Sequence, residues 1–235
     1  MSYYPVSLNL DGRQCVVIGG GRVAERKVQG LLACGGRVTV ISPELTAGLL
    51  ALYQDRLLAW EARLYREGDL AEVFLAIAAT DDGDVQRRIH AEAEGRQVLL
   101  NVADVPQYCS FILPATVRRG ELTIAVSTGG RSPALARNLR LELEKKFGSE
   151  YKILVDILGV LRQAVLADGR PQAENEALFN GLDHQTMLAF IRQGNWDGLA
   201  AHVRAVLGDG IGAGVWPTIR DIFASSASGA GRPAE

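Results

Sequence analysis

The sequence lacks the features of membrane proteins, disulfide-rich proteins and dedicated nucleic-acid binders. No apolar run approaches the roughly 20 residues of a membrane-spanning helix, and residues 1–5 lack the basic-then-apolar order of a signal peptide. The net charge of −2 argues against a broadly basic surface for nucleic acid or for an anionic membrane. We therefore expect a cytoplasmic protein that binds neither nucleic acid nor membrane.

Cysteine and histidine are also scarce, which argues against a disulfide framework and a structural metal. The three cysteines are odd in number and form no CxxC pair, so they are typical of small buried residues in a reducing compartment. The three histidines have no metal-ligand spacing. No bound metal is predicted. The residues concerned are Cys15, Cys34, Cys109, His90, His184 and His202.

Short apolar segments alternate with helical stretches over residues 15–102. Residues 73–79 are apolar on both faces, as a central parallel strand requires. This alternation predicts an α/β fold with a Rossmann-like, doubly wound parallel sheet within residues 1–113. The expected strands are residues 15–18, 37–41, 60–64, 73–79 and 97–102.

The pattern changes after Asp104. Residues 110–114 resemble a strand, and the turn at Arg119-Gly120 predicts a hairpin between residues 115–118 and 122–127. Ser132-Pro133 then suits the start of a helix. Three further parts are expected: a small strand–helix segment at residues 114–147, a helical C-terminal lobe at 148–223, and a disordered tail of small and polar residues at 224–235.

A glycine motif follows the first strand and opens the first helix. Gly19 permits a tight turn, Gly21 lets the backbone approach a pyrophosphate, and Ala24 keeps helix and strand close. The free N–H groups of the new helix then face the anion. The motif therefore predicts dinucleotide binding; a plain strand–helix turn is the alternative. Arg22 and Val23 belong to the same contact region.

The acidic residue that usually ends the second strand of such a unit is missing. About 20 residues after the motif, Asp or Glu would bind the ribose hydroxyls of NAD. Here Ser42 and Pro43 stand at that place, followed by Glu44, and no arginine in residues 42–46 favours a 2′-phosphate. We predict NAD as the cofactor, with ribose contacts from the backbone and from Ser42 or Glu44.

Five ordered blocks resemble the precorrin-2 dehydrogenase family, which includes the N-terminal module of siroheme synthase. The resemblance extends over about residues 4–146 and is more specific than the glycine motif alone. The blocks are GGGRVAERK at residues 19–27, AIAATDD at 76–82, NVAD at 101–104, SFILP at 110–114 and AVSTGGRSPALAR at 125–137.

The resemblance implies an enzyme that oxidises precorrin-2 to sirohydrochlorin with NAD⁺. Some members of the family also insert Fe²⁺ into the product, and whether this chain does so is left open. Members form homodimers through the segment after the Rossmann unit, which corresponds here to residues 114–147. A non-catalytic, nucleotide-sensing regulatory subunit and a dehydrogenase of another small molecule are the alternatives.

Asp104 is the candidate catalytic base. It follows the strand that ends at Asn101-Val102, at the carboxyl edge of the sheet where doubly wound folds bind ligands. In the family the matching aspartate serves dehydrogenation and, where present, chelation. The alternative from position alone is that Asp104 caps a turn before Pro106.

Other candidates are assigned to the cofactor and to the substrate. Thr80 and Asp81, with Asn101 and Val102, are expected to line the cofactor pocket, while Asp82 suits a helix cap. The loop Ser127, Thr128, Gly129 and Gly130 is expected to admit the macrocycle close to the backbone, unless it is a plain strand-to-helix turn. Precorrin-2 bears several carboxylates, which arginines bind well. The arginine candidates are Arg22, Arg118, Arg119, Arg131, Arg137 and Arg140, with Arg131 the strongest.

Overall fold

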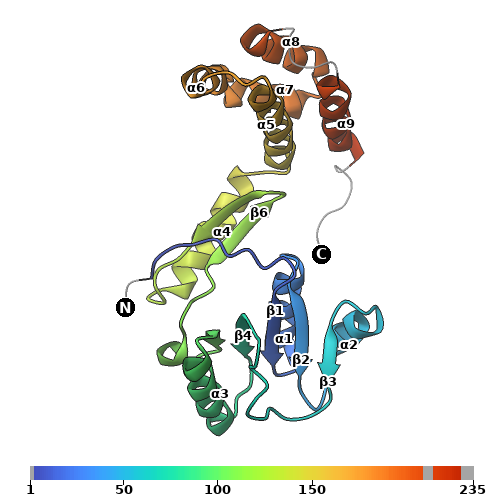
Figure 1. Ribbon diagram of the computed structural model, residues 1–235. Helices are drawn as coiled ribbons and strands as arrows, with labels where there is room; N and C mark the ends of the chain where they lie inside the picture. Colours follow the sequence, from blue (N-terminus) through green and yellow to red (C-terminus); the bar gives the residue numbers. More distant parts are fainter. Residues whose placement is uncertain (1–2, 209–213, 229–235) are drawn as a thin grey trace. The chain divides into compact units, whose positions relative to one another are not determined.

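The computed structural model describes residues 3–208 and 214–228 (Figure 1). By its internal contacts the chain divides into two compact units. The first takes in the chain up to Leu113 together with Gly129–Arg131, and the second takes in Pro114–Thr128 and the chain from Ser132 onward. The first unit is an α/β domain, and the second is a hairpin followed by helices.

The first unit contains a five-stranded sheet in the order β3-β2-β1-β4-β5. Every neighbouring pair of strands is parallel, which confirms the predicted Rossmann-like sheet. The sheet is built from β1 (Gln14–Ile18), β2 (Arg37–Ile41), β3 (Ala59–Glu61), β4 (Leu75–Ala78) and β5 (Leu99–Val102).

Helices cover both faces of this sheet. Val17 packs with α1 (Arg22–Leu32) and α2 (Ala47–Gln54), whereas its neighbours in β1 pack with α3 (Gly83–Arg96) on the other face. The alternation follows from the two-residue period of a strand. The sequence pattern did not predict α2, whose start depends on the Thr46 hydroxyl accepting the Leu49 N–H at 3.2 Å.

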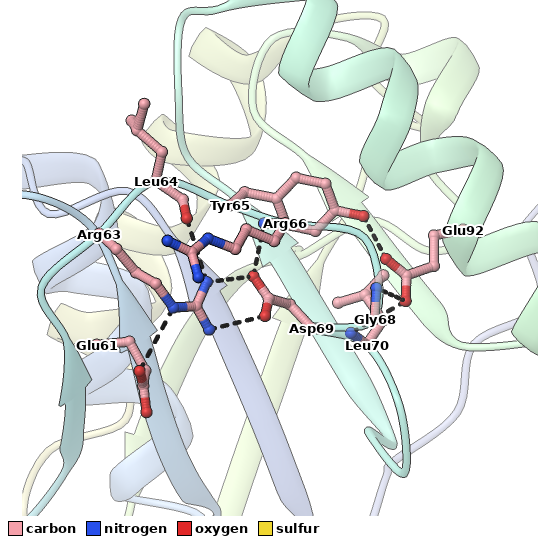
Figure 2. A network of polar contacts seen from close by, with 9 residues as sticks. All are labelled: Glu61, Arg63, Leu64, Tyr65, Arg66, Gly68, Asp69, Leu70 and Glu92. Carbon is pink, nitrogen blue, oxygen red and sulfur yellow. Dashed lines mark hydrogen bonds and ion pairs between the residues drawn. The ribbon is translucent and has the colours of Figure 1, made fainter.

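A network of polar contacts holds the connection between β3 and β4 (Figure 2). Arg63 donates from both terminal nitrogens to the Asp69 carboxylate at 2.8 Å. Glu92 of α3 accepts from the Tyr65 hydroxyl, from backbone N–H groups of the connection and from Arg96. Because these contacts satisfy both backbone and charge, the connection needs no regular secondary structure to stay ordered.

The second unit begins with the antiparallel hairpin of β6 (Ala115–Arg119) and β7 (Leu122–Val126), as predicted. Next comes α4 (Pro133–Lys146), whose N-terminus is capped by the Ser132 hydroxyl. Arg119 donates to the Phe147 and Glu144 carbonyls at 2.7 and 3.1 Å and so caps the other end of α4.

A helical lobe completes the second unit, and its buried core includes Ile157, Leu161 and Met187. The helices are α5 (Glu150–Ala167), α6 (Gln172–Gly181), α7 (His184–Gln193), α8 (Trp196–Leu207) and α9 (Val215–Ser228). Within the described ranges, no helix is both long and apolar enough to cross a bilayer.

Two expectations need correction. Residues 110–114 form no strand, because Ser110 is the one residue among them whose backbone pairs with the backbone of β5, and Pro114 has no N–H to donate. The helix α9 continues past Ala224 to Ser228, into the segment expected to be disordered. The rest of that expected tail, residues 229–235, lies outside the described residues.

Asp69→Asn is expected to lower the free energy of unfolding by about 1–2 kcal/mol at neutral pH, since it removes the charge that Arg63 binds. Burial alone would raise the pKa of Asp69, but hydrogen bonds from Arg63 and from the Arg66 N–H outweigh it and lower this pKa. The stabilisation is therefore complete above the unfolded-state pKa of about 3.9 and is lost as pH falls through the folded-state value.

Urea unfolding of wild type and variant between pH 7 and pH 3 measures this difference. The difference is expected to shrink below about pH 4. Glu67→Gln changes an exposed carboxylate in the same connection and serves as the control. A difference for Asp69→Asn that stayed constant over this range would contradict the assignment.

Candidate cofactor and catalytic site

Two glycines after β1 allow three backbone segments to meet. Gly19 has a φ of +119°, and a Cβ there would lie 2.4 Å from the Ala79 carbonyl oxygen. A Cβ on Gly20 would lie 1.9 Å from the Glu44 carbonyl oxygen. Both positions therefore require glycine. A role for Gly19 was predicted from the sequence and one for Gly20 was not, although the run of three glycines was a visible signal.

Gly21 differs from its two neighbours because space is open around it. It is the N-cap of α1 with a φ of −85°, no side chain caps the helix, and a Cβ would meet nothing within 4 Å. The first N–H groups of the helix, from Arg22 onward, have no partner within the helix. Open space beside uncapped N–H groups suits a phosphate, so these residues fit the pyrophosphate of a dinucleotide.

The segment after β2 packs against the glycine motif. The Gly19 N–H donates to the Ile41 carbonyl at 2.9 Å, and the Thr46 N–H donates to the Gly20 carbonyl at 3.0 Å. The Thr46 hydroxyl donates to Glu25 of α1 at 2.5 Å. These contacts hold the ends of β1 and β2 together at the carboxyl edge of the sheet.

The three residues expected at the ribose differ in exposure. Ser42 is buried, and its carbonyl accepts from the Trp60 ring nitrogen at 2.9 Å. Pro43 and Glu44 are exposed. The Glu44 carboxylate is thus the more accessible of the two polar side chains for a ligand.

Of the polar residues after β4, one caps a helix and another is exposed to solvent. The Asp82 carboxylate accepts the Asp84 and Val85 N–H groups at 2.9 and 3.1 Å, so Asp82 caps α3 as expected. The Thr80 hydroxyl accepts the Asp82 N–H at 3.3 Å. Asp81 is exposed beside them.

Asn101 and Val102 are buried at the end of β5. The Asn101 side-chain amide donates to the Phe111 carbonyl at 3.0 Å, and Val102 belongs to the apolar core on the α3 face. Both side chains therefore stabilise the protein around the site, and their contact with a cofactor stays a prediction.

Asp104 is exposed just beyond β5. Its φ of +61° is a left-handed conformation that few residues other than glycine adopt. The short helix that follows is capped by Val105 and has no side-chain cap bond, so the turn-capping alternative for Asp104 is wrong. No described residue donates a hydrogen bond to its carboxylate, which leaves both oxygens accessible.

Lys27 is a charged neighbour of Asp104 that was not predicted from the sequence. Its half-buried side chain extends from α1, and burial together with the Arg26 charge lowers the pKa of Lys27. The negative charge of Asp104 acts in the opposite direction. The ammonium group is therefore within electrostatic reach of Asp104. Its place in the GGGRVAERK block, one turn after Ala24, was the available signal.

Some of the candidate substrate-binding residues form hydrogen bonds or ion pairs within the protein, and others are exposed. Arg119 caps α4, and Arg140 forms an ion pair with Glu144 of the same helix. Arg131, Arg137 and Arg22 are exposed. The Thr128 hydroxyl accepts the Ser132 N–H at 3.0 Å. Gly129 and Gly130 have φ values of +61° and +81°, which is why that loop requires glycine.

Two family models match consecutive parts of this chain. Residues 6–115 match "Putative NAD(P)-binding", and residues 119–146 match "Sirohaem biosynthesis protein central". The chain belongs to the family of sirohaem-biosynthesis proteins. The first match assigns the glycine motif to an NAD(P)-binding domain, which confirms a nicotinamide dinucleotide as the class of cofactor.

Curated relatives agree with this assignment. The chain is 40% identical over 185 residues to the siroheme synthase of Neisseria meningitidis serogroup C, with 77% of this chain and 38% of the relative covered. It is 38% identical to the siroheme synthase of Mannheimia succiniciproducens, with 77% and 39% covered. The chain thus spans about two fifths of the length of these relatives.

A solved structure shares the fold. The protein named "SirC, precorrin-2 dehydrogenase" superposes with a TM-score of 0.70 at 24% identity, over 87% of this chain and 98% of that one. This likeness supports the observed architecture, with its parallel sheet and helical C-terminal region.

Substitutions at Gly20 and Gly21 are expected to separate folding from cofactor binding. Gly20→Ala is expected to lower the melting temperature by several degrees, because the added methyl would clash with the Glu44 carbonyl. Gly21→Ala is expected to leave the melting temperature unchanged but to weaken NAD⁺ binding about tenfold, because the methyl enters the open space at the N-terminus of α1.

Thermal unfolding followed by circular dichroism and titration calorimetry with NAD⁺ measure the two effects. Gly30→Ala, within α1 and with nothing within 4 Å of its added methyl, is the matched control. If Gly20→Ala and Gly21→Ala changed stability and affinity to the same extent, the distinction between the two glycines would be wrong.

Proposed function

We propose that this protein is an NAD-dependent dehydrogenase that oxidises precorrin-2 to sirohydrochlorin in sirohaem biosynthesis. The observation that supports the reaction is an exposed carboxylate, Asp104, at the carboxyl edge of a sheet whose first strand ends in a dinucleotide-binding motif. Relatives named siroheme synthase support the substrate class.

The proposed chemistry removes a hydride and a proton from the macrocycle. Bound NAD⁺ supplies the hydride acceptor. Asp104 takes the proton at a carboxylate oxygen, for which an exposed group without hydrogen bonds is suited. The glycine motif and the N-terminus of α1 hold the pyrophosphate and so fix the distance between the reacting carbons.

Preference for NAD over NADP is supported by the residues after β2. Glu44 is exposed there, and its negative charge would repel a 2′-phosphate. Ser42 is buried and offers no charge. We therefore assign NAD as the cofactor of the reaction.

Exposed arginines are proposed to bind the carboxylates of the macrocycle. Arg131 directly follows Gly129 and Gly130 in the chain, Arg137 lies in α4, and both are exposed. Guanidinium groups bind carboxylates with two parallel hydrogen bonds. Insertion of Fe²⁺ into sirohydrochlorin, in which Fe²⁺ would be a substrate, stays a prediction of the family resemblance. A cytoplasmic location stays a prediction from the sequence composition.

Anaerobic incubation of the purified chain with precorrin-2 tests the proposal. The visible absorption of sirohydrochlorin is expected to appear with NAD⁺, and more slowly with NADP⁺. Failure to form sirohydrochlorin with either cofactor would sink the assignment. Tight NAD⁺ binding without turnover would favour the regulatory alternative instead.

Asp104→Asn is expected to lower kcat about a hundredfold, since the amide cannot accept the proton. The KM for NAD⁺ is expected to change by less than about twofold, because the substitution removes no interaction that binds NAD⁺ in the ground state. The same absorption assay measures both constants. Asp11→Asn, an exposed aspartate at the amino end of β1, is the control. Full turnover by Asp104→Asn would remove the residue from its role.

We also propose a homodimer through residues 114–147. Among the described residues of α4 only Ala136 is buried, whereas Leu135 and Leu139 are 50% and 37% exposed one turn apart. Apolar side chains on one helical face favour a protein partner. A second copy is the partner that the family resemblance implies.

The double change Leu135→Glu and Leu139→Glu is expected to convert the dimer into a monomer, because charge would enter an apolar contact. Sedimentation equilibrium at micromolar concentration measures the mass. Leu166→Glu, at an exposed leucine of α5, is the control. A wild-type monomer, or a variant that stayed dimeric, would contradict this interface.

A further inference from the structure

The strand β5 lies at the edge of its sheet, with β4 on one side only. Its outward-facing backbone groups need other partners. Leu100 exchanges two such bonds with Ser110: its N–H donates to the hydroxyl at 2.8 Å, and its carbonyl accepts the Ser110 N–H at 2.9 Å. The returning chain therefore covers this edge in place of a sixth strand.

The Cys109 thiol serves Val102 in the same way. The Val102 N–H donates to the sulfur at 3.2 Å, while the sulfur lies 3.3 Å from the Val102 carbonyl and 3.5 Å from the Val105 carbonyl. The thiol is thus both an acceptor and a donor at the last residue of the strand. It joins the two ends of residues 102–109.

Asp104 lies inside this closed loop in the left-handed conformation. Such a backbone conformation is held in a residue other than glycine only when its surroundings enforce it. Further bonds tighten the loop: the Tyr108 N–H donates to Val105 and the Cys109 N–H to Pro106, each at 3.1 Å.

A second anchor holds the loop from the side. The Tyr108 ring stacks on His90 of α3, with centroids 4.5 Å apart and an interplanar angle of 21°. The stack fixes one side of the loop to a helix, and the thiol fixes its base to a strand. Asp104 is the exposed carboxylate between these two points.

We propose that Cys109 is a positioning residue for the reaction: its thiol closes the loop that aims the Asp104 carboxylate. The inference rests on the proposed function, because Asp104 is the base of that reaction. We assign Cys109 no direct contact with a reactant. It acts through the backbone geometry of residues 102–109.

Steady-state kinetics of precorrin-2 oxidation test the proposal in the full chain. Cys109→Ala removes donor and acceptor and is expected to lower kcat roughly ten- to a hundredfold, with the KM for NAD⁺ nearly unchanged. Cys109→Ser keeps a donor and an acceptor and is expected to recover most of the loss. Cys34→Ala removes a half-buried thiol outside this loop and is the matched control.

The Asp104→Asn background separates positioning from general stabilisation. If Cys109 acts through Asp104, then Cys109→Ala is expected to lower the residual kcat of Asp104→Asn by less than about twofold. If Cys109→Ala lowered kcat as much in the Asp104→Asn background as in the wild type, the proposal would be overturned. So would a Cys109→Ala enzyme with full kcat, or a Cys109→Ser enzyme as slow as Cys109→Ala.

Hydrogen exchange tests the loop without any turnover. In Cys109→Ala the Val102 amide loses its acceptor, so its exchange is expected to accelerate roughly fivefold or more, together with amides of residues 104–108. Unchanged exchange would overturn the proposal. If the wild type failed to oxidise precorrin-2, the proposed function would fall, while exchange would still decide whether the thiol closes the loop.

Discussion

The candidate site depends on the close approach of three backbone segments at Gly19 and Gly20. The carbonyls of Ala79 and Glu44 occupy the space where side chains on these glycines would stand. Because no Cβ intervenes, the ends of β1, β2 and β4 come together, and Gly21 is left at the open start of α1. The position of any dinucleotide follows from this packing.

The carboxyl edge of the sheet divides its polar residues into two kinds. The Asp82 side chain caps α3, and the Asn101 side chain donates to a loop carbonyl. Both contacts stabilise this edge of the sheet. Glu44 and Asp104 stay exposed. This division gives the first pair a structural role, and it leaves the second pair for the ligand chemistry that we propose.

A similar division applies in the second unit. Arg119 donates to carbonyls at the C-terminus of α4, and Arg140 forms an ion pair with Glu144. From the sequence alone, both were candidates for substrate binding in the same way as Arg131 and Arg137. The last carbonyls of a helix lack partners within the helix, so a nearby guanidinium donates hydrogen bonds to them. Arginine content alone therefore overstates how many such groups are available to an anionic substrate.

Much of the architecture was predictable from local pattern. The strands that form β1, β2 and β5, the hairpin and the helical lobe follow from apolar periodicity and turn residues, which act between near neighbours in the chain. The α2 helix was missed because its start depends on one capping hydroxyl, and the supposed strand at 110–114 failed because Pro114 has no N–H to offer an edge.

The sequence by itself determined the class of fold, the dinucleotide motif and the candidacy of Asp104, because each depends on residue type and order along the chain. Only the tertiary structure decided that Gly20 is required, that Lys27 lies within reach of Asp104, and that Cys109 closes the loop around it. These properties arise where segments distant in the chain meet, and no local pattern records such a meeting.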